Sequence, residues 1–274
     1  MPPDPFRDRV AVVTGGAGGI GFALAEAFAA RGAKIALADV DEAAMAARAK
    51  ALEARGAEVA CVATDVTQRG SVAALADAVW SRFGAAHLVC NNAGIALAGP
   101  LLQATPEDWR LTMDVNFWGV VHGVDAFAPR LVAQGQGGHV LNTASMAGLV
   151  GMGWLGIYCA SKFAVVGLSE SLRRELEPHG IGVSVLCPMI VATEITRNSL
   201  RVRGKEAPAA PAVDQPPASA LKGGVITAEE VAQRVVRGIE RNDPYVLTHP
   251  EQREFLRRRA ERLDAAFAPE RWAL

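Results

Sequence analysis

The stretch TGGAGGIG, residues Thr14–Gly21, follows the short apolar run Val10–Val13 and leads into a helix-like segment. Glycines in this arrangement permit a tight turn and let the backbone approach a pyrophosphate, which the N-terminus of the following helix favours electrostatically. We assign that role to Gly15, Gly19 and Gly21. A glycine loop alone can be a plain turn, so the prediction of dinucleotide binding depends on its strand–loop–helix context.

Short apolar runs alternate with longer amphipathic segments along most of the chain. The runs, rich in Val, Ile and Leu with little polar alternation, are typical of strands buried on both faces of a parallel sheet. They lie at Val10–Val13, Ile35–Ala38, Val59–Ala63, His87–Cys90, Val140–Thr143, Val183–Leu186 and Pro244–Thr248. Helices are expected at Gly19–Arg31, Asp41–Arg55, Ser71–Phe83, Glu107–Ala133, Ser161–Glu177, Ala228–Arg241 and Glu251–Phe267. This alternation predicts an α/β fold, a doubly wound parallel sheet of the Rossmann type with helices on both faces.

We expect a single domain over residues 1–274, with one insertion and one extension. From Arg203 to Gly224 the chain is crowded with Pro, Ala and Gly, a composition that does not hold a helix or strand for long. The segment 195–224 is therefore predicted to be a mobile loop, and 249–274 a C-terminal helical extension.

The composition excludes several classes of protein. The formal net charge is −1 and 21% of the residues are charged, so neither nucleic acid nor an anionic membrane surface is expected as a partner. The N-terminus lacks the apolar core of a signal peptide, and no run approaches the ~20 apolar residues of a membrane span. The four cysteines and five histidines lack metal-ligand spacing. We predict a cytoplasmic protein with reduced thiols, no metal site and a small-molecule substrate.

Asp39 ends the second predicted strand, 18 residues after Gly21. A carboxylate there can accept hydrogen bonds from the adenine ribose hydroxyls and would repel a 2′-phosphate. No Lys or Arg occupies Gly16–Gly18 or the positions just after Asp39. The sequence therefore predicts NAD as the cofactor, with NADP less favoured. Alternatively, Asp39 could cap the next helix, a role that Asp41 could also take.

The stretch GIYCASK, residues Gly156–Lys162, holds one of only two tyrosines in the chain. Lys162 follows Tyr158 by four residues, a spacing that puts both side chains on one face of a helix. An ammonium group so placed would lower the pKa of the tyrosine and fit it for proton transfer. By itself the pair could also be two residues that happen to share a face.

These motifs together resemble the short-chain dehydrogenase/reductase family, in its single-domain subfamily, over about residues 6 to 250. Thr14–Gly21 is similar to the family's TGxxxGxG loop, Asn91–Gly94 to its NNAG motif and Tyr158–Lys162 to its YxxxK motif. The resemblance implies a catalytic tetrad of Asn116, Ser145, Tyr158 and Lys162. Ser145 lies 13 residues before Tyr158, as the family pattern expects.

The resemblance also implies further cofactor contacts. Besides the loop glycines, Asp39, Tyr158 and Lys162, it assigns this role to Ile20, Asp65, Val66, Asn92, Ala93, Gly94, Pro188, Val191 and Thr193. One departure stands out, because Met189 follows Pro188 where the family usually has glycine. Methionine removes backbone freedom and adds an apolar side chain beside the expected nicotinamide site.

The tetrad suits alcohol oxidation by hydride transfer, in which the hydroxyl proton must be removed as the hydride leaves. Tyr158 would take or give that proton, and Ser145 would hold the substrate oxygen in register. By resemblance, Asn116 holds a water that joins Lys162 to solvent. Taken singly, Ser145 could be a turn residue, Asn116 a polar helix residue and Lys162 a surface cation.

The apolar stretch MAGLVGMGWLG after Ser145 leads directly to Tyr158 and predicts a hydrophobic substrate pocket. We assign to it Met146, Leu149, Trp154 and Met189, with Met152, Leu155 and Ile190 nearby; core packing or a subunit contact is the alternative. The segment 195–224 lies where family members carry a lid, and its Arg197, Arg201, Arg203 and Lys205 could meet an anionic group or solvent. The pattern favours a bulky or aromatic secondary alcohol and its ketone.

The sequence therefore predicts an NAD-dependent alcohol dehydrogenase or ketone reductase. The alternatives are an NADPH-preferring carbonyl reductase and a non-catalytic cofactor-sensing or scaffold protein on the same fold. The resemblance implies a homotetramer or homodimer formed through the predicted helices Glu107–Ala133 and Ser161–Glu177.

Overall fold

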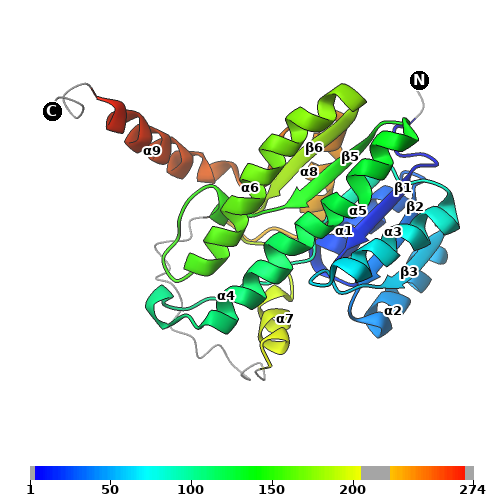
Figure 1. The fold of residues 1–274 in the computed structure, drawn as a ribbon, viewed down its shortest axis with the longest axis horizontal. Helices are drawn as coiled ribbons and strands as arrows, with labels where there is room; N and C mark the ends of the chain where they lie inside the picture. Colours follow the sequence, from blue (N-terminus) through cyan, green and yellow to red (C-terminus); the bar gives the residue numbers. More distant parts are fainter. Residues whose placement is uncertain (1–3, 205–222, 269–274) are drawn as a thin grey trace.

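The computed structural model describes residues 4–204 and 223–268, and within them seven parallel strands form one sheet in the order β3-β2-β1-β4-β5-β6-β7 (Figure 1). The strands are β1 (Val10–Thr14), β2 (Lys34–Asp39), β3 (Val59–Ala63), β4 (Leu88–Asn91), β5 (Gly138–Thr143), β6 (Ile181–Cys187) and β7 (Tyr245–Leu247). Every pair of neighbours is parallel. The predicted doubly wound fold is confirmed.

Helices cover both faces of this sheet. Those of the described residues are α1 (Gly19–Ala29), α2 (Glu42–Glu53), α3 (Arg69–Phe83), α4 (Pro106–Met113), α5 (Gly119–Gln134), α6 (Gly156–Leu176), α7 (Ile195–Val202), α8 (Ala228–Glu240) and α9 (Arg253–Asp264). One core cluster joins α1, α2 and α8 to the sheet, and a second joins α3, α5 and α6 to its other face. Successive β1 residues, such as Ala11 and Val12, pack into the clusters on opposite faces of the sheet. The strands therefore need to be apolar throughout.

The strand order reverses between β1 and β4, because the chain moves outward from β1 to β3 and then returns beside β1. In open α/β sheets, ligands bind outside the carboxyl ends of the strands at such a switch point. The segments that follow β1 and β4 meet here, and both carry predicted cofactor residues.

Two predicted helices differ from the structure. The segment Glu107–Ala133 is not one regular helix, because a π-helical stretch, Asp114–Trp118, separates α4 from α5. Such bulges are frequently found at functional sites. The helix predicted from Ser161 begins earlier, at Gly156, so Tyr158 lies in its first turn.

The prediction of a loop over 195–224 is wrong for its first part, which forms α7. Buried Ser199 accepts a hydrogen bond from the Ala96 amide (2.8 Å), and Arg203 pairs with the buried carboxylate of Asp108 in α4 (2.6 Å). These tertiary contacts stabilise a helix that composition did not reveal. The rest of the predicted loop, 205–222, lies outside the described residues, as does the C-terminal end of the predicted extension, 269–274.

The C-terminal helix α9 follows a 3-10 turn, Pro250–Gln252, and extends away from the sheet (Figure 1). None of its residues is fully buried. Within residues 4–204 and 223–268, no helix combines the length and apolarity needed to cross a bilayer.

Candidate active site

The glycine-rich loop after β1 can exist only without side chains at certain positions. Gly15 and Gly19 have φ values of +65° and +52°, a region that favours glycine. A Cβ on Gly21 would lie 2.1 Å from the Gly15 carbonyl oxygen, and one on Gly19 would lie 3.3 Å from Thr193 Cγ2. Gly18 occupies the N-cap of α1 and provides no side-chain cap, so the first amide groups of the helix are left to bind an anion.

Thr14 joins this loop to the NNAG segment after β4. Its hydroxyl accepts hydrogen bonds from the amides of Asn92 (2.9 Å) and Ala93 (3.1 Å), and its carbonyl accepts one from Asn92 Nδ2 (3.1 Å). Asn92 Oδ1 in turn accepts a hydrogen bond from Thr143 at the end of β5 (3.2 Å). Three strand ends are thereby fixed to one another at the switch point.

Asp39 lies at the end of β2 against the glycine-rich loop. Its Oδ2 accepts a hydrogen bond from the Ala17 amide (3.0 Å), and its Oδ1 accepts one from the Asp41 amide (3.0 Å). Asp41 is the N-cap of α2, accepting from the Ala44 amide (3.0 Å). Asp39 is therefore not that helix's cap, and its carboxylate supports the loop.

Arg48 is a residue of this region that the sequence analysis missed. Its Nε donates to the Ala17 carbonyl (3.2 Å), and its guanidinium lies 4.5 Å from the centre of the Phe22 ring. Ala17 is thus held between an anion and a cation. Basic residues were expected only at Gly16–Gly18 or just after Asp39. Arg48 lies farther along the chain, within α2, and the packing of that helix brings it back to Ala17.

The segment after β6 approaches the same loop. The Pro188 carbonyl accepts hydrogen bonds from the Ser145 hydroxyl (3.3 Å) and the Met146 amide (2.9 Å). Val191 pairs with Ile226 in an isolated bridge, and the Thr193 side chain lies beside Gly19. Among the described residues Met189 is not one of the non-glycine positions with positive φ, so the backbone here does not require the family's usual glycine.

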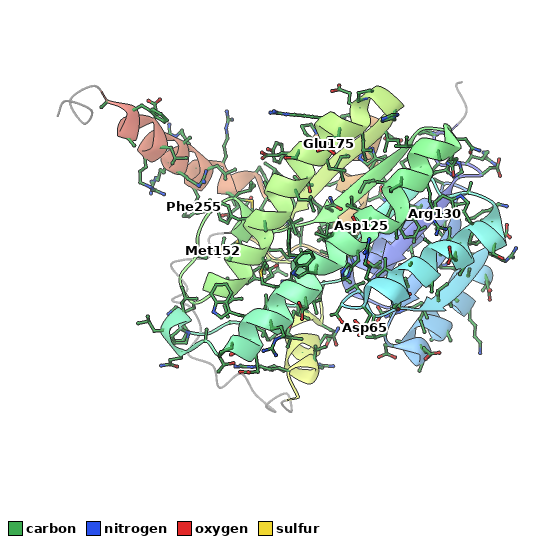
Figure 2. The ribbon with its side chains drawn as sticks, viewed as in Figure 1. Asp65, Asp125, Arg130, Met152, Glu175 and Phe255 are labelled. Atoms are coloured by element: carbon green, nitrogen blue, oxygen red, sulfur yellow. The ribbon has the colours of Figure 1, made fainter. Side chains whose placement is uncertain are left out.

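The remaining predicted cofactor residues lie at the same edge of the sheet. Asp65 follows β3 and is exposed, with Oδ1 accepting hydrogen bonds from the Thr67 amide and hydroxyl (Figure 2). Val66 is buried and packs against Gly119. Ile20 packs on the core beneath the first turn of α1. These positions agree with an extended dinucleotide across the switch point, and Ile20 and Val66 pack against the protein there.

Ser145, Tyr158 and Lys162 come together at the carboxyl ends of β5 and β6. Lys162 is buried, its ammonium donates to the Thr143 carbonyl (2.9 Å), and it lies 5.7 Å from the centre of the Tyr158 ring. A Cβ on Gly148 would lie 2.6 Å from the Lys162 carbonyl oxygen, so the segment after Ser145 packs directly on α6. The predicted pair therefore shares one helical face, beside the predicted serine.

Burial controls the protonation of both residues. It raises the pKa of Tyr158 to about 12, and the neighbouring Ser145 hydroxyl acts in the opposite direction. Burial lowers the pKa of Lys162 to about 8. The prediction that Lys162 gives Tyr158 a lowered pKa is wrong for the structure, because the removal of the phenolate from water outweighs the other influences.

Asn116 lies in the π-helical stretch and is fully buried. Its Oδ1 accepts from the Ile95 amide (2.8 Å), and its Nδ2 donates to the Ile95 carbonyl (2.9 Å) and to Ser161 (3.1 Å). A Cβ on Gly94 would lie 3.2 Å from Asn116 Oδ1 and 3.4 Å from Lys162 Nζ. The fourth predicted tetrad member is thus a close neighbour of Lys162 across Gly94.

The predicted substrate residues divide into two groups. Met146 is 1% exposed and belongs to the core cluster that contains Val166 and Cys187, so core packing is the better account of it. Leu149 and Met189 are partly exposed and pack against that cluster. Trp154 is also partly exposed, and it adopts a φ of +66° with its carbonyl bound by the Gly99 amide (2.8 Å).

Trp154 is the bulky exception among the described non-glycine residues with positive φ, since the others are Asp8 and Asn242. Short polar side chains tolerate this region, whereas a residue with a bulky indole side chain adopts it only at a cost in free energy. Backbone strain of this kind concentrates at binding and catalytic sites. The loop before Tyr158 is therefore held in a costly conformation.

A nicotinamide dinucleotide fits the residues present. Gly15, Gly19 and Gly21 let the loop pack closely against the segments that carry Asn92 and Thr193, and the N-terminus of α1 provides uncapped amides for a pyrophosphate. At the carboxyl ends of the strands, Asp39 after β2 offers a hydrogen-bond acceptor, and Lys162 beside the end of β5 offers a hydrogen-bond donor.

The family model of the short chain dehydrogenase matches residues 9–203. The chain therefore belongs to the short-chain dehydrogenase/reductase family, and it is a nicotinamide-dependent oxidoreductase that acts on an alcohol or ketone.

Three proteins of known name or structure are similar to this chain over most of its length. A short-chain dehydrogenase/reductase from Burkholderia phymatum, solved in complex with NAD, is 41% identical with a TM-score of 0.87, covering 96% of this chain and 97% of that one. The C alpha-dehydrogenase of a Sphingobium species is 34% identical over 269 residues, 96% of this chain and 88% of the relative. The 1-deoxy-11-beta-hydroxypentalenate dehydrogenase of Streptomyces exfoliatus is 41% identical over 201 residues, 73% of each chain.

The glycine-rich loop can be tested with a matched pair of variants. Gly19→Ala should weaken NADH binding by about tenfold, because alanine is strained at positive φ and its Cβ would approach Thr193. Gly70→Ala, at an exposed position in the first turn of α3, is the control, since its Cβ would meet nothing within 4 Å. NADH fluorescence titration measures both, with melting temperatures recorded alongside. Equal affinities for the two variants would contradict the role of Gly19.

Proposed function

We propose that this enzyme transfers a hydride between NAD and a hydrophobic, uncharged secondary alcohol or ketone, with Tyr158 as the acid/base. One arrangement supports this assignment above all others. The hydroxyls of Ser145 and Tyr158 are neighbours above the buried ammonium of Lys162, at the strand edge that also carries the glycine-rich loop.

Each residue of this group has a defined task. A bound nicotinamide accepts the hydride during alcohol oxidation and supplies it during ketone reduction. Tyr158 accepts the proton of the substrate hydroxyl, or donates one to the carbonyl oxygen in the reverse reaction. Ser145 donates a hydrogen bond to the substrate oxygen and keeps it within reach of Tyr158.

Lys162 stabilises the phenolate form of Tyr158 that arises during oxidation. Its ammonium lies on the ring side of the tyrosine, in surroundings poor in water, where a charge acts more strongly than in solvent. We propose that a water held at Asn116 links Lys162 to solvent. The position of Gly94 between Asn116 Oδ1 and Lys162 Nζ supports this path.

The preference for NAD rests on the charge of Asp39. The carboxylate borders the loop where the adenine ribose is expected and would repel a 2′-phosphate. Arg48 is the observation that favours the alternative, an NADPH-preferring carbonyl reductase. We assign Arg48 to supporting the loop, because its Nε is already bound to the Ala17 carbonyl and its guanidinium stacks on Phe22.

The preference for an apolar, uncharged substrate has two supports. Leu149 and Met189 are partly exposed and pack on the cluster that includes Met146, the neighbour of Ser145, and Trp154 is partly exposed in the loop that leads to Tyr158. Two basic residues of this segment already have partners, since Arg197 pairs with Glu194 and Arg203 with Asp108. The dehydrogenase names of the Sphingobium and Streptomyces relatives agree with an alcohol substrate, and we propose a bulky or aromatic one.

We also propose that the enzyme is a homotetramer or homodimer formed through α4, α5 and α6. Exposed aromatic side chains lie along this helical layer, with Trp109 39% and Trp118 48% accessible. Aromatic residues are enriched in subunit interfaces.

The acid/base assignment is tested by the chain's two tyrosines. Tyr158→Phe should lower kcat by about 10²- to 10⁴-fold, the usual contribution of a positioned proton-transfer group. Tyr245→Phe is the control, because Tyr245 lies on β7 and bonds to Glu170. An unchanged kcat for Tyr158→Phe would contradict the assignment of Tyr158 as the acid/base.

The direction of the pH dependence follows from the same group. Tyr158 must be deprotonated to accept a proton, and burial raises its pKa to about 12. Alcohol oxidation should therefore rise with pH across the range in which the protein is folded, whereas ketone reduction should stay nearly constant below this pKa, because Tyr158 remains protonated there. Steady-state rates in both directions from pH 6 to 10 measure this, with roughly tenfold change per unit as the limiting slope. A flat pH profile for alcohol oxidation by the wild type would exclude the assignment.

Cofactor preference is tested by removing one charge at a time. Asp39→Asn should lower the KM for NADPH by about tenfold by removing the repulsion of its 2′-phosphate. Arg48→Gln should weaken both cofactors alike if Arg48 supports the loop, and NADPH alone if it binds the phosphate. Arg55→Gln, at the far end of α2 and paired with Glu26, is the control.

The assembly is tested at Trp118. Trp118→Glu should reduce the mass measured by light scattering to that of a smaller assembly, because a carboxylate would be buried in the interface. Lys50→Glu on α2, exposed on the opposite face, should leave the mass unchanged. A wild-type monomer would refute the proposal directly.

A further inference from the structure

The first turns of α9 pack against the apolar cluster beside the catalytic group. Leu256 is partly buried and contacts the cluster that Met146, Val166 and Cys187 build between β5, β6 and α6. Leu149, Met152 and Met189 pack against the same cluster. Figure 2 labels Phe255, the neighbour of Leu256, at the start of α9, and Met152 in the loop before α6.

Contacts on two sides fix this part of the chain. The buried ring of His249 bonds to the Gly224 carbonyl (3.0 Å) and to the Thr248 hydroxyl (2.7 Å), just before the turn that starts α9. One turn after Leu256, the Arg259 guanidinium lies 5.4 Å from the centre of the Phe163 ring. Phe163 directly follows Lys162, so α9 is anchored to the catalytic helix itself.

The same cluster is connected to Tyr158 through its neighbour in sequence. Cys159 Sγ accepts a hydrogen bond from the Met152 amide (3.3 Å), which fixes the loop carrying Leu149 and Met152 to the first turn of α6. Partly exposed apolar side chains from three separate segments, at Met152, Met189 and Leu256, thus pack on one cluster, which includes Met146, the neighbour of Ser145. A contiguous apolar surface beside convergent polar groups is typical of a small-molecule site.

We propose that Leu256 is a specificity-determining residue, whose side chain forms part of the apolar wall against which the carbon skeleton of the substrate packs. This inference rests on the proposed function of the same site. It places part of the substrate site in the C-terminal helix, beyond residues 9–203 that match the family model. The rest of α9 is exposed, with Leu263 51% accessible, so the helix contributes to this wall only through its first turns.

Three variants test the proposal, each assayed with a bulky aryl ketone and with a small aliphatic ketone. Leu256→Ala should raise the KM for the aryl ketone by about tenfold and change that for the small ketone by less than about twofold, since only the larger skeleton reaches the wall. Leu256→Met retains the volume and should restore the wild-type ratio. Leu263→Ala on the exposed part of α9 should match the wild type. The KM for NADH and the melting temperature are recorded for all three.

Binding provides a second readout that does not require turnover. Quenching of tryptophan fluorescence by the aryl ketone, with NADH present, should show about tenfold weaker binding for Leu256→Ala alone. An equal loss with both ketones, or no change with either, would overturn the role of Leu256 while leaving the proposed function standing. Failure of the wild type to bind or reduce any ketone or oxidise any alcohol would overturn the proposed function and this inference with it.

Discussion

The site depends on how closely the chain after β1 approaches the chain after β4. Thr14 makes this contact with both its hydroxyl and its carbonyl, and the missing side chain of Gly15 makes it possible, since a Cβ there would lie 3.0 Å from Ala93 Cα. From Asn92 the contact continues to Thr143, whose carbonyl holds the Lys162 ammonium. The place that receives the dinucleotide and the place that performs proton transfer are therefore parts of one hydrogen-bonded unit, which carries any displacement of the loop to the lysine.

Burial has opposite effects on the two titrating groups of this unit. It favours the neutral form of Tyr158 and also the neutral form of Lys162, so each is driven away from the charge that catalysis requires. A phenolate and an ammonium can form together in such surroundings because each relieves the isolation of the other. The protein thus keeps the proton on Tyr158 until an additional positive charge or a reacting hydroxyl shifts the balance.

Local sequence signals predicted the features that local physics determines. Strands buried on both faces must be apolar throughout, and turns with positive φ need glycine, so the sheet and the loop at Gly15–Gly21 could be predicted. Features caused by contacts between distant segments could not. The π-helical stretch reflects the bonds of Asn116 to the Ile95 backbone, α7 reflects Ser199 on Ala96, and the place of Arg48 depends on how α2 packs beside α1. The pKa of Tyr158 was predicted in the wrong direction because depth of burial is not visible in a spacing of four residues.

The left-handed conformation of Trp154 has a consequence for engineering. A backbone of this kind costs an ordinary side chain about 1–3 kcal/mol, and glycine would adopt it freely. Trp154→Gly would relieve this cost, and the same exchange would remove a partly exposed indole that we assign to the substrate pocket. Directed evolution of this enzyme must therefore select for activity and thermal stability at the same time. At this one position, a gain in stability alone would remove part of the substrate pocket that activity requires.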